Sequence, residues 1–272
     1  VYSNVIYYVI IKNRVIKYDN ERFNSNNHGT QPSDYANVLR ATHTHSWIDK
    51  FHSQYKVINL YSNDLQWLKE ANEISSKTGK FTEIYREELN QFVTKYDPFL
   101  TDKFIRSENV SLKYGQHGAG PYNNMEQVIE SLVSSINGHS PIYPDTEHIK
   151  LYLLPWLKID PWKEFRVFVY KNKITAISQQ NLHNYYPELT VGKINLYGIL
   201  ITNYFNTTLK NKIDLDSYTY DFALLDDDKP YFIELNSFGK EYASGSALFH
   251  WLLDEDILYN EDGNIEFRYN YK

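Results

Sequence analysis

Two β-forming runs joined by an acidic turn constrain the fold of this chain more than any other segment. The stretch YDFALLDDDKPYFIELNSFG, residues 220–239, carries isolated polar groups inside its apolar runs. A polar turn between two such runs predicts an antiparallel hairpin. Pairing that is symmetric about Asp227 and Asp228 sets Asp221 directly opposite Glu234.

Three oxygen-bearing side chains are thereby predicted to share one face of this hairpin. Glu234 and Asn236 are two residues apart on one strand, so both point to the side of Asp221. Ile233 and Leu235 are expected on the other face. Carboxylates that face each other repel unless a cation compensates them, and hard oxygen ligands suit Mg²⁺. A solvated sheet face with an accidental register is the alternative that the spacing leaves open.

A second hairpin and several amphipathic segments complete an α+β pattern. The run EFRVFVYKNKITAISQQ, residues 164–180, alternates so that Phe165 and Val167 share one face while Arg166 and Phe168 share the other. We expect an α+β fold with antiparallel sheets, in two lobes that meet near residue 155. Further elements are predicted as a hairpin over 4–18 with Asn13 in its turn, strand-like pieces at 56–60 and within 102–115, and helices at 35–52, 64–76, 83–95, 125–136, 189–210 and from Ser246.

Composition narrows the class of protein. The chain has 272 residues, of which 42% are hydrophobic, enough to fill a large core. It contains no cysteine, which excludes disulfides and thiolate metal sites. A net charge of −6 argues against nucleic-acid binding as its main role. No run approaches the roughly 18 uncharged apolar residues of a membrane span, so we expect a soluble, cytoplasmic protein.

Basic residues and a Gly-rich loop are candidates for phosphate contacts. Arg106 and Lys113 flank a predicted turn, and Arg166 lies on the polar face of a strand. The loop GQHGAGPYNN, residues 115–124, can approach phosphates closely because its glycines lack side chains. Its spacing fits neither a P-loop nor a dinucleotide fingerprint. Taken singly, a strand arginine is more often a salt-bridge residue and such a loop is more often only a loop.

Five motifs in order resemble the cell division cycle protein 123 family, a branch of the ATP-grasp superfamily. They span about residues 43 to 251, and their order is more specific than any one of them. The motifs are SWIDKF (46–51), FIRSENVSLK (104–113), EFRVFVYKNKITAISQQNLHNYY (164–186), the carboxylate hairpin (220–239) and SALFHW (246–251).

The resemblance implies an ATP-grasp-like fold in which two lobes with antiparallel sheets sandwich a nucleotide. The corresponding domains are an N-terminal extension at 1–40, an N-terminal lobe at 41–154, and a C-terminal lobe at 155–272 that carries the metal-binding hairpin. ATP and Mg²⁺ are the implied ligands.

The resemblance also implies roles for individual residues. Arg106 and Lys113 contact the nucleotide phosphates, while Asp221, Glu234 and Asn236 hold Mg²⁺. Arg166 faces the phosphates. The adenine edge is held by backbone groups of Leu154, Pro155, Trp156 and Leu157.

The chain departs from the family pattern at several positions. Glu234 stands where the family usually has Asp, and Ser237 stands where it has Pro. Gln180 and Asn181 replace an Arg-Asp pair, which removes one charge of each sign. The Gly-rich loop also differs from the usual continuation.

Two functions from different classes follow. The resemblance implies an assembly chaperone that binds the gamma subunit of eukaryotic translation initiation factor two, with ATP and Mg²⁺ as a structural or switching ligand and the protein as a monomer. The alternative is an ATP-grasp ligase that activates a carboxylate or a nucleic-acid end. A zinc cluster of His43, His45 and His52 is a third idea, disfavoured because residues two apart on a helix do not share a face.

Overall fold

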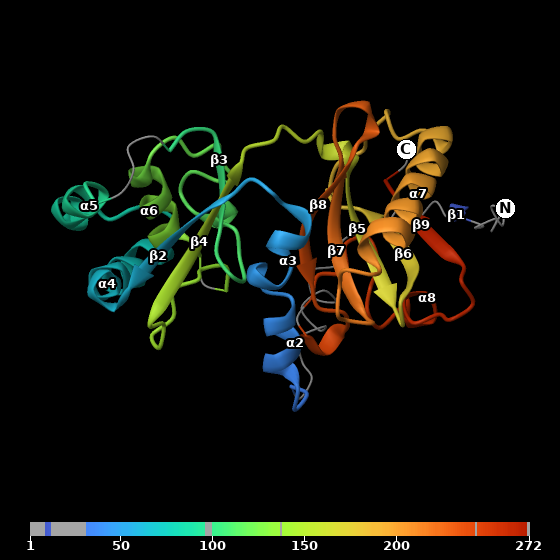
Figure 1. Ribbon diagram of the computed structural model, residues 1–272, viewed down its shortest axis with the longest axis horizontal. Helices are drawn as coiled ribbons and strands as arrows, with labels where there is room; N and C mark the ends of the chain where they lie inside the picture. The colour runs from blue at the N-terminus through green and yellow to red at the C-terminus, as the bar shows by residue number, and fades with distance from the viewer. Residues whose placement is uncertain (1–8, 12–30, 96–99, 137, 243, 271–272) are drawn as a thin grey trace. The chain divides into compact units, whose positions relative to one another are not determined.

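The chain forms two compact units, each with its own sheet (Figure 1). The larger unit comprises the described parts of residues 1–51 and 158–272, and the smaller unit those of residues 52–157. The computed structural model describes residues 9–11, 31–95, 100–136, 138–242 and 244–270.

A six-stranded sheet forms the centre of the larger unit, in the order β1-β9-β6-β5-β7-β8. Strand β5 pairs antiparallel with β6 and β7, and β7 pairs antiparallel with β8. Strand β9 runs parallel to both β6 and β1, so the sheet is mixed. The strands are β1 (Val9–Ile11), β5 (Glu164–Tyr170), β6 (Lys173–Gln179), β7 (Tyr218–Leu224), β8 (Pro230–Asn236) and β9 (Ile265–Arg268).

Helices cover the apolar face of this sheet. On α3 (Thr44–Phe51), the ring of Trp47 lies 5.3 Å from that of Phe232 on β8. On α7 (Val191–Tyr204), the ring of Tyr197 lies 5.8 Å from that of Phe165 on β5. The π-helical turn Phe205–Leu209 continues α7. The same unit holds the short helices α2 (Tyr35–Ala41) and α8 (Glu255–Leu258).

The opposite face of β5 carries a second aromatic cluster. Phe168 packs edge-on against Trp251 at 5.6 Å, and Tyr170 stacks on Phe238 at 5.5 Å. Phe165 and Val167 are fully buried toward the other face. The predicted two-faced alternation of this strand is therefore confirmed.

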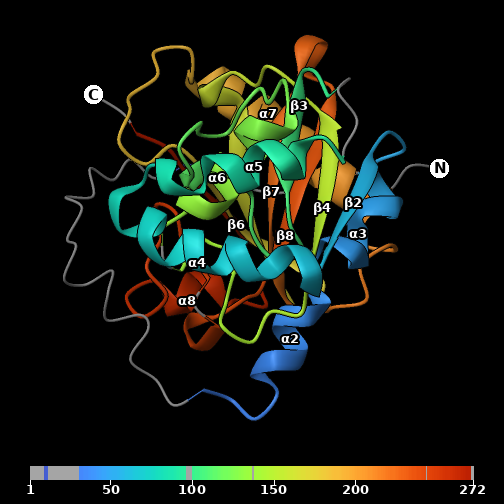
Figure 2. The ribbon, with the colours of Figure 1, turned by 90° about the vertical axis from the view of Figure 1, so that its left-hand side faces the viewer.

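The smaller unit is a three-stranded antiparallel sheet with helices on one face. Its strands are ordered β2-β4-β3. Figures 1 and 2 both show the helices α4, α5 and α6 on the same side of these strands. The elements are β2 (Lys56–Tyr61), α4 (Ser62–Thr78), α5 (Arg86–Val93), β3 (Lys103–Arg106), α6 (Met125–Ser134) and β4 (His148–Pro155).

The expected α+β class with antiparallel pairing is confirmed, and most predicted elements are present. The single helix expected over 35–52 is broken, because α2 ends at Ala41 and α3 begins at Thr44. The strand-like piece expected after residue 110 is a 3₁₀ turn, Leu112–Tyr114. The hairpin predicted over 4–18 lies mostly outside the described residues.

One strand was not predicted, and one predicted helix was wrong. Strand β4, with the sequence HIKLYLLP, was missed, because prolines at 141, 144 and 155 stand before it and at its end. No helix starts near Ser246; the described residues 246–254 form turns, and Ala247 has a φ of +50°. The Leu248 amide donates to Ser178 Oγ, and the His250 amide donates to Asp254 Oδ2. Side chains thus satisfy backbone groups that a helix would have paired internally.

The predicted domain limits remain a prediction, and the compact units differ from them at one point. Residues 41–51, expected in the N-terminal lobe, belong to the larger unit through α3. The second limit of the compact units falls between Leu157 and Lys158, close to the expected 155. Among the helices that the structure describes, none combines the length and the hydropathy needed to cross a bilayer.

A buried ion network fixes β9 to the turns before α8. Arg268 donates from Nη1 and Nη2 to Asp254 at 2.7 and 2.8 Å, and from Nε to Glu266 at 2.7 Å. The arginine and Asp254 are each 2% exposed, and the guanidinium lies 4.0 Å from the Phe249 ring centre. These charges are removed from water, so each depends on the others for compensation.

We expect Arg268→Met to lower the free energy of unfolding by about 3–5 kcal/mol, because it leaves two carboxylates buried without their cation. Urea denaturation measures this change. The matched control is Lys50→Met, which removes the pair with Asp214 whose side chain is 96% exposed; its cost should stay below about 1 kcal/mol. Equal costs for the two variants would contradict this account.

Candidate functional site

A row of polar side chains crosses four strands of the larger unit. Ser178 on β6 pairs with Arg166 on β5, Arg166 pairs with Asp221 on β7, and Asp221 pairs with Glu234 on β8. Residues that are directly opposite one another in a sheet project to the same face. The fold therefore places Arg166, Asp221 and Glu234 side by side, as the counting of strand positions predicted for the two carboxylates.

Asp221 and Glu234 are paired as predicted, but the turn between their strands differs from the predicted one. The pairing nearest the turn joins Leu224 with Pro230, so the turn is centred on Asp227, whose φ is +57°. A register shift then follows, and Asp221 pairs with Glu234 while Ile233 opposes no residue of β7 in the register. An extra residue of this kind is a β-bulge. Because of this extra residue, Asp221 lies opposite Glu234 even though the turn is centred on Asp227 alone.

The bulge also changes which residues of β8 reach the core. Phe232 and Leu235, three apart, are both buried. Phe232 stacks on Tyr220 at 6.2 Å, and Leu235 is the register partner of Tyr220. Ile233, expected on the core face with Leu235, is the bulged residue and is only half-buried.

Arg166 and Asp221 form a bidentate ion pair at the centre of the row. Arg166 donates from Nε to Asp221 Oδ1 and from Nη2 to Asp221 Oδ2, both at 2.8 Å. Its Nη1 donates to the carbonyl oxygen of Gly245 at 3.1 Å. The Asp221 side chain is 2% exposed and that of Arg166 is 12% exposed. Such fork-to-fork pairs are strong and directional.

Burial and the neighbouring charges shift the pKa values of Asp221 and Arg166. Burial raises the pKa of the Asp221 carboxyl; Arg166 opposes this shift, and the negative Glu234 adds to it. Burial lowers the pKa of the Arg166 guanidinium, but the charge and hydrogen bonds of Asp221 outweigh burial, so that pKa is raised. Arg166 thus supplies one of the two positive charges that would balance the carboxylate pair.

The donor set fits Mg²⁺ on its chemistry. Asp221 and Glu234 offer carboxylate oxygens from adjacent strands, and their charges exceed that of Arg166 by one. Asn236 is two residues beyond Glu234, and within the described chain its buried Nδ2 has no hydrogen-bond partner. An amide in such surroundings offers its oxygen to a cation after rotation by 180° about its last bond. Hard oxygens of this kind are the ligands that Mg²⁺ prefers.

Two neighbours of this site were missed by sequence reasoning. Gln180, noted only as a departure from the family pattern, donates from Nε2 to Asp221 Oδ2 at 3.1 Å. Gly245 lies against Arg166, and a Cβ added to it would stand 2.6 Å from Nη1. The position of Gln180 just after a β-strand was a usable signal, whereas nothing local in the sequence pairs Gly245 with Arg166.

The other predicted site residues belong to the smaller unit. Arg106 is buried at the end of β3, opposite Tyr152 of β4. Lys113 lies in the 3₁₀ turn, with Nζ 5.6 Å from the Tyr114 ring centre. Leu154 and Pro155 end β4, and Leu157 follows. The Trp156 amide donates to Asp102 O at 2.9 Å. Their nucleotide contacts remain predictions.

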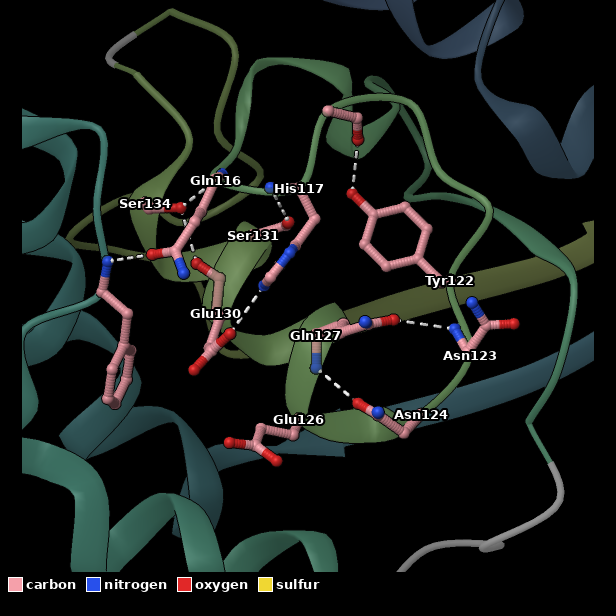
Figure 3. Close-up of polar contacts among 12 residues, drawn as sticks. Gln116, His117, Tyr122, Asn123, Asn124, Glu126, Gln127, Glu130, Ser131 and Ser134 are labelled. Carbon is pink, nitrogen blue, oxygen red and sulfur yellow. Dashed lines mark hydrogen bonds and ion pairs between the residues drawn. The ribbon is translucent and has the colours of Figure 1, made fainter.

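The Gly-rich loop is fastened to helix α6 (Figure 3). The Gln116 amide donates to Ser134 Oγ at 2.8 Å, and the His117 amide donates to Ser131 Oγ at 3.0 Å. A Cβ on Gly115 would lie 2.2 Å from the Ser131 carbonyl oxygen, so close packing on the helix requires this glycine. These two amides are already bound to hydroxyls, and phosphate contacts are not needed to explain the loop's first glycine.

A side-chain contact reinforces the same attachment. His117 Nε2 lies 2.6 Å from Glu130 Oε2 of α6 (Figure 3). Within the loop itself, Tyr122 donates its hydroxyl to Gly118 O at 2.6 Å. Among the histidines considered for zinc, the rings of His43 and His45 lie 6.0 Å apart, because His43 precedes the first residue of α3. A zinc site there stays a hypothesis.

Comparison with known proteins places this geometry in context. The family model described as D123 matches residues 124–271. A translation initiation factor eIF2 assembly protein from Candida albicans is 31% identical over 129 residues, 46% of this chain and 36% of that protein. Its counterpart in Botryotinia fuckeliana is 25% identical over 202 residues, 68% of this chain and 48% of that protein.

The alignments reach only part of the curated relatives. The Dictyostelium discoideum eIF2 assembly protein is 27% identical over 114 residues, 41% of this chain and 29% of that protein. The chain therefore spans between 29% and 48% of the length of these three relatives. The solved structure of Cdc123 from Schizosaccharomyces pombe shares the fold, with a TM-score of 0.63 at 18% identity over 87% of this chain and 98% of that one.

We expect Gly245→Ala to cost about 1–3 kcal/mol of unfolding free energy, because its methyl group overpacks a guanidinium that two hydrogen bonds hold in place. Urea denaturation measures the change. Gly192→Ala on α7 is the matched control, since its Cβ would meet nothing nearer than Thr190 Oγ1 at 4.0 Å. A helix position of this kind gains stability with alanine. A neutral Gly245→Ala would show that Arg166 moves freely.

His139 gives a pH-dependent prediction in the smaller unit. The residue as a whole is exposed, but its ring lies 4.0 Å from that of Tyr114. Partial desolvation of the ring, and then the charge of Lys113, lower the pKa of the imidazole. A lowered pKa contributes stability above the ordinary histidine value near 6.5, and this contribution is lost as pH falls through the lowered pKa.

The stability advantage of the wild type over His139→Gln should therefore shrink as pH falls from about 7 to about 5. Urea denaturation at a series of pH values measures it. His148→Gln, which removes a ring stacked on Tyr61 at 6.1 Å, is the control for loss of a His–Tyr contact elsewhere in the unit. A difference between wild type and His139→Gln that is constant with pH would contradict the assigned shift.

Proposed function

The chain belongs to the D123 family, and from that premise we propose that it is an ATP- and Mg²⁺-binding assembly protein for translation initiation factor eIF2, acting through the gamma subunit. The family match covers the strands and turns that build the polar row. The observation that carries the proposal is the cross-strand pair of Asp221 and Glu234 beside Arg166, in a chain whose relatives are named eIF2 assembly proteins.

The residues of the row have separate roles in this proposal. Asp221, Glu234 and Asn236 hold the cation through oxygen atoms, and Arg166 keeps the Asp221 carboxylate in one orientation. A bound Mg²⁺ neutralises phosphate charge and orients the phosphates. Because Arg166 is engaged by Asp221 and Gly245, a phosphate contact by Arg166 requires it to share or exchange these partners.

The smaller unit contributes the other proposed contacts. Arg106 and Lys113 bind phosphate oxygens, and backbone groups of the segment 154–157 hold the adenine edge. ATP that binds only the assembly-competent form stabilises that form by mass action, with no need for hydrolysis. ATP then acts as a switching ligand for partner binding.

We expect Glu234→Gln to weaken Mg²⁺-dependent ATP binding at least about tenfold, because it removes one of two carboxylates that hold the cation. Calorimetric titration of ATP with and without MgCl2 measures this. Asp214→Asn, at an exposed position of the same unit, is the control and should leave affinity unchanged. Equal ATP affinity in Glu234→Gln and the wild type would place the metal elsewhere.

Pull-down of the purified gamma subunit tests the assembly role. The wild-type chain should retain the subunit in Mg²⁺ and ATP and retain less of it without ATP, and Glu234→Gln should lose the ATP effect. Binding that ignores ATP, or no binding at all, would reject the assembly role while leaving nucleotide binding to be judged by the titration.

A further inference from the structure

We propose that two copies of this chain associate through the free edge of strand β2, so that their three-stranded sheets join into one across a two-fold axis. The occupant of this edge is a second copy, because the sequence of β2 is complementary to itself in an antiparallel register. The resulting dimer differs from the monomer that the family resemblance implies. It involves the smaller unit alone and is independent of the metal site and of the proposed function.

The two edges of the smaller unit's sheet differ. On the outer side of β3, the Lys103 amide donates to Tyr122 O at 3.0 Å, and the Tyr122 amide donates to Lys103 O at 2.9 Å. Arg106 forms a further bridge with Ser111. Strand β2 is six residues long, and among the strands that the structure describes it pairs only with β4 (Figure 2). Every second residue of such a strand directs its N–H and C=O groups away from the sheet, where another strand can bind them.

Strand β2 lacks the features with which proteins usually block an open edge. Its sequence, KVINLY, contains neither proline nor glycine, and its register with β4 is continuous. Its one charged residue is Lys56, at the first position. Prolines, bulges and charged side chains within the strand are the usual means of protection. An edge without them is a template for the addition of a further strand.

The side chains of β2 alternate between a core face and an open face. Leu60 is fully buried and Ile58 packs against the same core. Val57, Asn59 and Tyr61 alternate with these residues and project to the other face of the sheet. Val57 is 39% exposed and Tyr61 is 60% exposed. Two large hydrophobic side chains therefore remain accessible on the open face, on either side of Asn59.

One antiparallel register matches the polarity of the opposed residues on both faces. With Asn59 opposite Asn59 of the second copy, Val57 lies opposite Tyr61 of the second copy, and Ile58 lies opposite Leu60 of the second copy. Opposed residues project to the same face, so apolar pairs form on both faces of the joined sheet and the two amides meet at the axis. Centring the pair on Ile58 instead would set the charged Lys56 opposite Leu60.

The charges of two identical strands are also compatible in this register. The two Lys56 residues stand at opposite ends of the strand pair, about 20 Å apart at a rise of about 3.4 Å per residue. This separation exceeds the Debye length of about 8 Å at physiological ionic strength, so their repulsion is screened. A pair of short strands is nevertheless a small interface. We expect a concentration-dependent dimer with a dissociation constant of about 10–500 μM.

Sedimentation equilibrium at protein concentrations from about 5 μM to about 1 mM measures this association. Val57→Lys removes the apolar pair with Tyr61 of the second copy and places a charge on the edge, so it should raise the dissociation constant at least about tenfold. Val191→Lys is the matched control, because Val191 is a 54% exposed valine on α7 of the larger unit. It should leave the dissociation constant unchanged. If thermal unfolding shows that Val57→Lys does not fold, Tyr61→Lys replaces it with the same expected effect.

The absence of cysteine from the chain permits a separate test of the register. Asn59→Cys brings one thiol from each copy to the two-fold axis, at a separation from which a disulfide can form. After mild oxidation, non-reducing electrophoresis should show a covalent dimer of Asn59→Cys. The control is Asn90→Cys, at an exposed position on α5, which should remain mostly monomeric under the same conditions.

Two results would overturn the proposal. One is a wild type that stays monomeric over the whole concentration range, which would leave the edge to an extended segment of another protein. The other is a dimer whose dissociation constant does not change in a folded variant at Val57 or Tyr61, since its interface then lies elsewhere. The ATP titration and the gamma-subunit pull-down are measured separately, so neither result decides the proposed function.

Discussion

The bidentate pair between Arg166 and Asp221 is the interaction on which the polar row depends. Strand β7 is buried along its whole length, and Asp221 lies in its middle with a second carboxylate opposite. Without a cation, two facing carboxylates at this depth would oppose the folding of the hairpin. Arg166, directly opposite on β5, removes that conflict and at the same time fixes the plane of the carboxylate.

A second buried arginine, Arg268, also binds carboxylate and carbonyl oxygens, and it holds the other end of the segment 245–254. Arg268 binds Asp254 through two nitrogens and also donates to Leu248 O at 3.2 Å. Arg166 donates to Gly245 O. Two strands therefore hold the segment 245–254 through its carbonyl groups and one aspartate. This explains why a sequence with helical composition forms turns, and why the segment lies against the polar row.

Predictability from sequence differed among the parts of the site. The opposition of Asp221 and Glu234 was predicted, but from a two-residue turn that the chain does not have; a wider turn and a bulge at Ile233 together give the same pair. Strand β4 was hidden because prolines flank a run that alternates poorly, and both faces of a central strand are buried. Gln180 was visible as an unusual residue, yet its bond to Asp221 joins strands that are not adjacent in the sheet.

The sequence by itself determined the local pattern: which runs form strands, which face of β5 is apolar, and which oxygen-bearing residues of β7 and β8 share a side. These properties follow from periodicity and turn residues, which act over a few positions. Only the tertiary structure decided that Arg166 binds Asp221, that Gly245 backs the guanidinium, and that Gln180 occupies one carboxylate oxygen. Such contacts join residues tens of positions apart, and they depend on strand order, bulges and the path of irregular segments, which local patterns do not specify.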